Sequence, residues 1–239
     1  MVFYLIGLGL NEKSISLEAV EALEESEIVY LENYTVDYPY NIKDFEKIIG
    51  KSVVELGRKE VEEEGFLNDA RKKDIALLVY GNPLSATTHI SLILACKKQK
   101  IKYRIIHAES ILTAIAETGL QLYKFGKTAS MPRWQKSFEP DSFLDIIRDN
   151  LKIGAHSLLL TDIGLSNKSA MGQLKIACDK KEMKLDKIII CSQVGKNTKI
   201  YYDSIENLEK KKIDMPFCII IPAGLHYLEQ EALDVLEEK

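Results

Sequence analysis

The sequence predicts an α/β protein of two lobes, each a mixed, mostly parallel sheet flanked by helices. Apolar runs suited to buried strands alternate with helix-like segments along most of the 239 residues, which is typical of this architecture. Near residues 107–112 the pattern changes to a helix of small residues, and a second set of strands follows. We therefore expect an N-terminal α/β lobe over residues 1–108 and a C-terminal α/β lobe over residues 109–239.

In the N-terminal lobe, short apolar runs bounded by turn-forming residues predict strands at 2–6, 27–31, 52–56, 75–80 and 103–106. Ser16 is suited to cap the first helix, whose residues Leu17, Val20 and Leu23 recur on one face. Further helices are expected at 42–49, at the acidic segment 60–73, and at 89–100 with Ile90, Ile93 and Leu94 inward. The aromatic turn with Tyr34, Tyr38 and Tyr40 could serve core packing, a lid or a substrate surface.

The C-terminal lobe is expected to open with the small-residue helix around residues 108–119, which Gly119 can end. Its predicted strands lie at 128–131, 157–162, 187–194, 200–202 and 217–221. Its predicted helices lie at 142–150, 168–184 and 228–237.

Composition excludes several classes of protein. The formal net charge of −4 argues against bulk electrostatic binding to nucleic acid. No apolar run approaches the ~20 residues of a membrane span, and the N-terminus has the pattern of a strand and not of a signal peptide. The four cysteines are far apart without C-x-x-C spacing, which favours buried, reduced thiols over a metal site or disulfides. We therefore expect a cytoplasmic protein without a membrane anchor.

The stretch IALLVYGNPLSATTH at residues 75–89 is the most informative in the chain. A buried-strand pattern ends sharply at a Gly-x-Pro turn, and hydroxyl side chains precede the next helix. This makes an open, donor-rich lip at the carboxyl end of a sheet, where α/β proteins bind small ligands.

Other expected strand ends also carry glycine or hydroxyl side chains, and such ends can converge on one cleft. They are Gly7–Leu10 after the first strand, His107–Ile111, Thr161 with Asp162, Val194 with Gly195, and Pro222–His226. The pair Gly7 and Gly9 is only a weak dinucleotide signal, because the position of the third glycine is Glu12.

Several segments resemble, in the same order, those of the diphthine synthase family, called diphthine methyl ester synthase in eukaryotes, within the tetrapyrrole methylase superfamily. They are FYLIGLGL at the N-terminus, GNPLSATTH at 81–89, HAESI at 107–111, TGLQLYKFGKT at 118–128, PDSF to HSLLLTDI at 140–163, and PAGLH at 222–226. The resemblance covers nearly the whole chain, and residues 165–215 match least.

The resemblance implies a two-lobed tetrapyrrole methylase fold, a homodimer, and S-adenosyl-L-methionine bound in the cleft between lobes, with S-adenosyl-L-homocysteine as product. It implies methylation of the 3-amino-3-carboxypropyl group on a histidine of translation elongation factor 2, in diphthamide biosynthesis. The positions that correspond to cofactor contacts are Leu10, Asn82, Ser85, Ser110, Ile111, Thr161, Val194 and His226. No metal is implied.

The acceptor implied by the resemblance is an α-amino group with an ordinary pKa near 8, so deprotonation at pH 7 costs only ~1–2 kcal/mol. A dedicated general base is therefore not required. Asp162 could take the proton or serve as a strand-end residue, and the sequence does not rank His89, His107 and His226. The number of methyl transfers, and whether a carboxyl ester forms, also stay open.

The chain departs from the family motif Gly-Asp-Pro, because residues 81–83 are Gly-Asn-Pro and Asn82 takes the place of the aspartate. If the family carboxylate faces the cationic cofactor, we expect weaker cofactor binding here. If position 82 only orders the turn, the change is harmless.

Two other functions are open: a methylase of the same fold acting on a tetrapyrrole or RNA, and a catalytically silent homologue that binds the cofactor. The small-residue helix at 111–119 is a candidate dimer contact.

Overall fold

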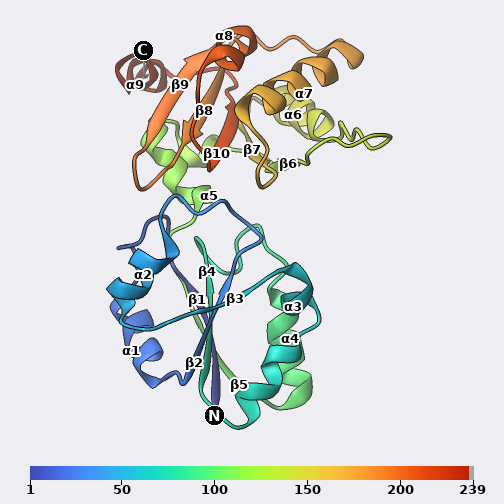
Figure 1. Cartoon of the computed structure of the whole chain (residues 1–239). Helices are drawn as coiled ribbons and strands as arrows, with labels where there is room; N and C mark the ends of the chain where they lie inside the picture. The colour runs from blue at the N-terminus through green and yellow to red at the C-terminus, as the bar shows by residue number, and fades with distance from the viewer. Residues whose placement is uncertain (237–239) are drawn as a thin grey trace. The chain divides into compact units, whose positions relative to one another are not determined.

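The computed structural model describes residues 1–236. It divides into two compact units, Met1–Ala114 and a second that begins at Ile115 (Figure 1). Each unit holds one five-stranded sheet with flanking helices, so the α/β fold class is confirmed. The division falls six residues after the expected junction of 108 and 109.

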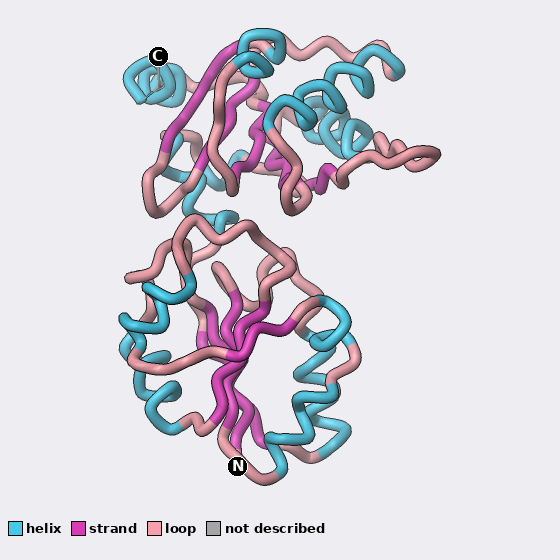
Figure 2. Tube along the Cα trace, viewed as in Figure 1, coloured by secondary structure: helices cyan, strands magenta, loops and turns pink. Residues whose placement is uncertain are grey.

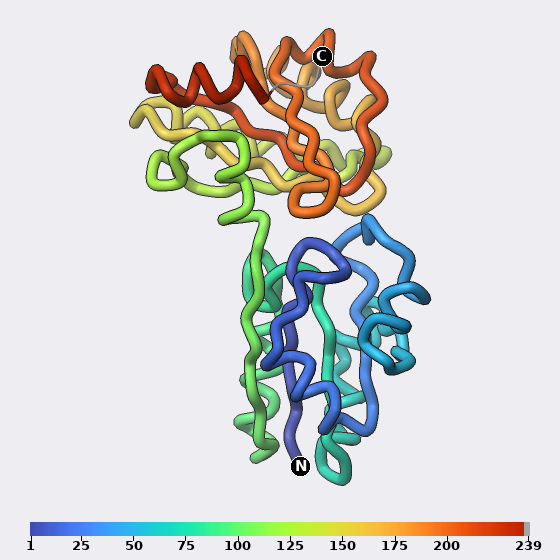
Figure 3. The backbone as a smooth tube through the Cα atoms, turned by 90° about the vertical axis from the view of Figure 1, so that its left-hand side faces the viewer, coloured from blue at the N-terminus to red at the C-terminus, as the bar shows by residue number. Residues whose placement is uncertain are grey.

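The first sheet contains five strands that all run parallel, in the order β3-β2-β4-β1-β5. They are β1 (Val2–Gly7), β2 (Ile28–Glu32), β3 (Val54–Leu56), β4 (Ile75–Val79) and β5 (Lys102–Ile106). Figure 3 shows β1, in deep blue, between the teal β4 and the green β5. A parallel arrangement places the carboxyl ends of all five strands at the same edge.

Helices cover both faces of this sheet (Figure 2). The face with Tyr4 and Ile6 packs against α1 (Leu17–Glu25) and α2 (Ile42–Ile49). The face with Phe3 and Leu5 packs against α3 (Arg58–Glu62), the 3-10 helix η1 (Gly65–Arg71) and α4 (Ile90–Gln99). Both faces are therefore dry, which explains the continuous apolar runs in the strands.

The structure corrects which helical faces are buried. Helix α1 buries Ala19, Ala22 and Leu23, whereas Leu17 is 83% exposed and Val20 is at the surface. The small alanines let the helix approach the sheet closely. The alanine face is therefore the buried one, and the larger Leu17 and Val20 lie at the surface. The expected Ser16 cap is confirmed, because Ser16 Oγ accepts the Ala19 N–H at 3.1 Å.

The inward face of α4 and the acidic helix are also corrected. Helix α4 buries Ile93 as expected, together with Leu92 and Cys96, but leaves Ile90 and Leu94 about half exposed, because apolar residues occur on both of its sides. The expected helix over 60–73 is two helices. Residue Glu64 between them has a left-handed backbone, with φ of 57°, which an α-helix does not accommodate.

The second sheet has the order β6-β7-β10-β8-β9, and only β6 and β7 are parallel. The expectation of a mostly parallel sheet is therefore wrong for this unit. The strands are β6 (Ala129–Met131), β7 (Ser157–Thr161), β8 (Ile188–Ser192), β9 (Lys199–Asp203) and β10 (Phe217–Ile221). Strand β10 lies between β7 and β8 and runs against both, which the apolar pattern of a buried strand does not reveal.

The α-helices in the described part of the second unit are α6 (Phe143–Lys152), α7 (Asn167–Lys180), α8 (Ile205–Lys210) and α9 (Tyr227–Leu236), and a short 3-10 helix, η3, spans Leu122–Lys124. The expected end of the last helix at Glu237 lies outside the described residues. The small-residue helix shrinks to α5 (Ile111–Ala114), in the first unit, and then tightens into the 3-10 helix η2 (Ile115–Thr118). Gly119, at φ 79°, follows η2, which confirms the expected stop.

All four cysteines are buried and unpaired, so their expected burial is confirmed. No helix within residues 1–236 is long and apolar enough to cross a membrane.

Candidate functional site

Three strand-end loops meet closely at the carboxyl edge of the first sheet. They follow β1, β4 and β5, which are neighbours in the sheet. The loops after β1 and β4 exchange backbone hydrogen bonds between Gly9 and Gly81, at 2.9 and 3.3 Å. At Gly7 a Cβ atom would lie 2.7 Å from Gly81 O and 2.9 Å from Ala108 Cβ, so any side chain there would push the loops apart. The expected convergence of strand ends therefore holds in this unit.

Leu10 belongs to this loop cluster. It is buried, and its carbonyl oxygen accepts a hydrogen bond from the Tyr80 hydroxyl at 2.9 Å. That bond ties the first loop to the end of β4. Tyr80 also packs edge-on against Tyr38, with ring centroids 5.6 Å apart, and Tyr38 in turn packs against Tyr40. Of the three roles open for the tyrosines, core packing beneath the loops fits this arrangement for Tyr38 and Tyr40.

Asn82 engages both the oxygen and the nitrogen of its amide within the loops. Its Oδ1 accepts the Leu84 N–H at 3.1 Å, and its Nδ2 donates to Ala108 O at 3.1 Å. The same nitrogen lies 3.1 Å from Nδ1 of His107. Asn82 thus orders the turn after β4 and also ties that turn to the segment after β5. Its effect on cofactor affinity stays a prediction.

Ser85, Ser110 and Ile111 complete the predicted set in the first unit. Ser85 is half-buried, and its N–H donates to the Asn82 carbonyl at 3.1 Å. Ser110 is buried, and its Oγ accepts the Leu112 N–H at 3.2 Å at the start of α5, which begins at Ile111. The structure therefore brings four predicted residues of this unit into adjoining loops, and the fifth, Ile111, begins the helix that follows one of them.

Strand β2, which neighbours β4 in the first sheet, ends in a buried acid that the sequence did not reveal. Glu32 ends β2 and is fully buried, with Oε2 4.0 Å from Nε2 of His89. Burial raises the pKa of Glu32 to about 7, although the hydrogen bond from Thr35 and the charge of Arg58 act in the opposite direction. Burial likewise lowers the pKa of His89.

His89 is held on both ring nitrogens. Nδ1 lies 3.2 Å from Pro83 O, and Nε2 lies 3.3 Å from the Tyr34 hydroxyl. With 1% of its surface exposed, His89 supports the loop and does not face a ligand. This contact also gives Tyr34 a packing role.

Asp162, in the second unit, caps its own turn by accepting the N–H groups of Ile163 and Arg133.

In the second unit, two predicted residues share one sheet edge and the third does not. Thr161 ends β7 and donates from Oγ1 to Phe217 O at 2.7 Å, and Val194 follows the parallel end of β8. His226 follows β10, whose last residue pairs with the first residue of β7. Because β10 runs antiparallel, Pro222–His226 leaves the opposite edge. The predicted convergence of the strand ends of this unit on one cleft stays a prediction.

The loop before α9 is built around a buried carboxylate that sequence reasoning also missed. Glu229 is fully buried and accepts hydrogen bonds from Lys124 Nζ at 2.5 Å, from the N–H groups of Gln121 at 3.0 Å and His226 at 2.7 Å, and from His156 Nε2 at 3.1 Å. Burial alone would raise its pKa, but these donors outweigh it and hold the pKa at about 2.

His156 and Lys124 extend this network to the loop itself. Nδ1 of His156 accepts the Ala223 N–H at 2.9 Å, and Lys124 donates to Gly224 O at 2.9 Å. Burial lowers the pKa of His156, which keeps Nδ1 available as an acceptor. The partners of Glu229 lie more than one hundred positions away at Gln121 and Lys124, so no local motif announces the network.

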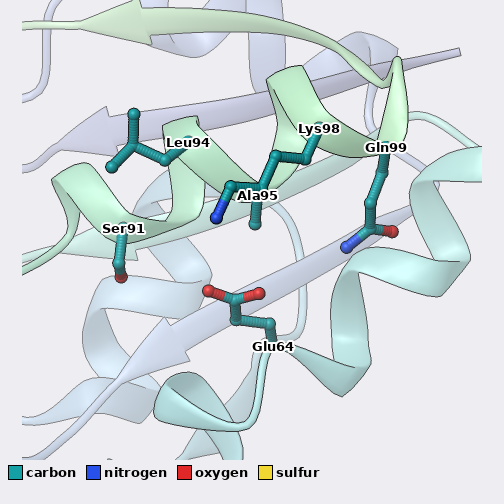
Figure 4. A pocket seen from close by; sticks show the side chains of 6 residues that line it. All are labelled: Glu64, Ser91, Leu94, Ala95, Lys98 and Gln99. Atoms are coloured by element: carbon teal, nitrogen blue, oxygen red, sulfur yellow. The ribbon is translucent and has the colours of Figure 1, made fainter.

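A pocket of about 230 Å³ lies elsewhere in the first unit, between α4 and Glu64, the residue that precedes η1 (Figure 4). Its lining residues are Glu64, Ser91, Leu94, Ala95, Lys98 and Gln99. None of the predicted site residues takes part in it.

Comparisons with known proteins agree over most of the chain. The model of the tetrapyrrole (corrin/porphyrin) methylases matches residues 2–208. A diphthine synthase of Methanocaldococcus jannaschii is 35% identical, covering 98% of both chains. A diphthine methyl ester synthase of Schizosaccharomyces pombe is 34% identical over 97% of this chain and 93% of its own. A crystal structure of diphthine synthase superposes with a TM-score of 0.90 at 33% identity, covering 99% of this chain and 96% of that one.

Proposed function

The chain belongs to the tetrapyrrole (corrin/porphyrin) methylase family, and among its members to the diphthine synthases; from this premise we propose that it methylates elongation factor 2. The methyl groups would go to the 3-amino-3-carboxypropyl group already attached to a histidine of that factor. The observation that carries the proposal is the likeness to diphthine synthases over 98% of the chain, at 35% identity. The protein is accordingly a methyltransferase.

The proposed methyl donor is S-adenosyl-L-methionine, which supplies an electrophilic methyl sulfonium when bound. Such a cofactor needs hydroxyl and backbone groups for its ribose and amino-acid parts, and the loop cluster of the first unit offers both. We propose the contacts Leu10, Asn82, Ser85, Ser110 and Ile111 from the first unit, and Thr161, Val194 and His226 from the second. Gly7 supports this choice, since its missing side chain lets those loops adjoin.

The residues of this chain would act by alignment and not by proton abstraction. An α-amino acceptor loses its proton at a cost of only ~1–2 kcal/mol at pH 7. His89 is buried with both ring nitrogens engaged, and Asp162 caps a turn, so neither is placed to serve as a base. In-line alignment of acceptor and methyl group then supplies the rate.

We further propose a homodimer in the cytoplasm, with elongation factor 2 as the protein partner and without nucleic acid. The same-fold alternatives act on a tetrapyrrole or RNA, and a silent homologue binds cofactor without transfer. The names of the relatives favour the first proposal over these.

The test incubates the protein with cofactor labelled in its methyl group and elongation factor 2 carrying the aminocarboxypropyl group. The control is the same factor with an unmodified histidine. Transfer only to the modified factor supports the proposal, and mass spectrometry then counts methyl groups and detects an ester. Cofactor binding without transfer supports the silent homologue, and transfer to neither factor refutes the proposed substrate.

A further inference from the structure

The orientation of the Asn82 amide is fixed by two backbone partners. The Leu84 N–H needs an acceptor, so the atom 3.1 Å from it is Oδ1. The Ala108 carbonyl oxygen needs a donor, so the atom 3.1 Å from it is Nδ2. Exchanging oxygen and nitrogen would place donor against donor and acceptor against acceptor. The atom of Asn82 that faces His107 is therefore Nδ2, which can donate hydrogen bonds but cannot accept them.

This orientation decides the tautomer of His107. Nδ1 of His107 lies 3.1 Å from Asn82 Nδ2, so Nδ1 must be the acceptor of that contact. A neutral imidazole with an acceptor at Nδ1 carries its proton on Nε2. No hydrogen bond within residues 1–236 engages Nε2, and the side chain is exposed. His107 thus presents a single N–H donor beside the loop cluster.

We propose that Asn82 fixes His107 as an Nε2–H donor, and that this donor holds a carboxylate oxygen of a ligand at the loop cluster. The inference rests on the proposed function, because both the methyl donor and the aminocarboxypropyl acceptor carry a carboxylate. His107 is then a binding residue and not a proton acceptor, since its outward nitrogen has no free lone pair. In addition to its own proposed contact with the cofactor, Asn82 then positions His107.

An aspartate at position 82 would reverse the arrangement. A carboxylate donates nothing, so it would lose the bond to Ala108 O and would attract an N–H at Nδ1 of His107. At a pH where the imidazole is neutral, the outward nitrogen would then become an acceptor. Asn82→Asp is therefore expected to weaken binding of a carboxylate ligand, which is the opposite of the gain expected if the lost charge faced the cofactor.

The first experiment measures the tautomer directly, by long-range ¹⁵N–¹H NMR of the histidine rings in the full-length protein without cofactor. At a pH high enough to keep the ring neutral in both proteins, the proposal expects the Nε2–H form of His107 in the wild type and the Nδ1–H form in Asn82→Asp. An Nδ1–H form in the wild type would overturn the proposal, whether or not the proposed function is correct.

The second experiment identifies the carboxylate by calorimetry and kinetics on His107→Ala and His107→Gln. The Gln amide can replace the Nε2–H donor, whereas Ala cannot. If the carboxylate belongs to the cofactor, His107→Ala lowers the affinity for S-adenosyl-L-homocysteine about tenfold, as expected for the loss of a hydrogen bond to a charged group. Methylthioadenosine, which lacks the carboxylate, is then unaffected. If the acceptor is the source, KM for the modified factor rises about tenfold.

Retention of binding in Gln and loss in Ala supports the donor role. Unchanged affinity and unchanged KM in Ala overturn it. A wild type that binds no S-adenosyl-L-homocysteine refutes the proposed function, and the NMR result then still reports on the tautomer.

Discussion

Replacing Glu229 by glutamine tests whether the buried network holds the second unit together. The carboxylate accepts two donors on each oxygen: Gln121 and His156 on Oε1, and Lys124 and His226 on Oε2. A glutamine keeps one oxygen and turns the other into a donor, so at least two donors lose their acceptor. Unsatisfied buried donors cost about 1–3 kcal/mol each, and breaking a buried ion pair costs roughly 3–5 kcal/mol. We expect the second unit to lose about 3–5 kcal/mol of unfolding free energy.

Urea unfolding followed by tryptophan fluorescence measures this loss. Trp134 is the single tryptophan of the sequence, packs on the core of the second unit, and donates to Pro140 O at 3.0 Å. Its emission therefore reports that unit selectively. The matched control is Glu231→Gln, an exposed position of the same helix, which should change stability by less than about 0.5 kcal/mol. A Glu229→Gln loss below about 1 kcal/mol would refute the reasoning.

The same variant makes a pH prediction. The folded pKa of Glu229, about 2, lies below the ordinary value of 4.5, so its stabilisation is complete above pH 4.5 and is lost as pH falls toward 2. The wild type should lose stability across that window, and Glu229→Gln should lack this component. Equal pH slopes for the two proteins would contradict the assignment.

Three further predictions concern single positions. The pKa of Glu32 in the folded protein is raised from 4.5 to about 7, so the wild type loses stability as pH rises between these values. Glu32→Gln lacks this loss. The difference in unfolding free energy between variant and wild type should therefore be roughly 3 kcal/mol more in favour of the variant at pH 8 than at pH 4, measured by urea unfolding followed by circular dichroism. An equal difference at both pH values would contradict this. Gly119→Ala places a Cβ 2.2 Å from Ala232 Cβ at φ 79° and should cost about 2–4 kcal/mol, whereas Gly154→Ala, at φ 71° with open space around it, should cost about 1–2 kcal/mol by Trp134 fluorescence. Similar costs would show that the clash relaxes. Ser16→Ala removes a helix cap and should cost about 1 kcal/mol; no loss by circular dichroism would show that water replaces the cap.

Element types were predictable where the local pattern decides them. The strand at 75–80 and the stop at Gly119 follow from apolar runs and glycine conformation, and the structure has both. Which face of a helix is buried depends on what packs against it, and this is why Leu17 and Leu94 proved exposed. Strand direction in the second sheet was not predictable either, because an apolar run is the same in both directions.

The candidate site divides in the same way. Leu10, Asn82 and Ser110 lie in segments that follow predicted strands, and such strand ends can converge, so the segments could be grouped from sequence. The resemblance to the family selected these residues within them, and the order of the strands came only from the structure. Glu32 and Glu229 could not, because a carboxylate in a strand or helix gives no local sign of burial. Their roles come from partners distant in sequence, which only the folded chain brings near.

The position of β1 inside the first sheet has a consequence for how the chain folds. Strand β1 pairs with β4 and β5, which lie about 70 and 100 residues further along, and such long-range parallel pairing is intrinsically slow. During synthesis, its apolar side chains leave the ribosome well before either partner exists. Until β4 and β5 emerge, an unpaired strand edge is open to association with other chains. The nascent N-terminal segment is therefore where we expect chaperones to act.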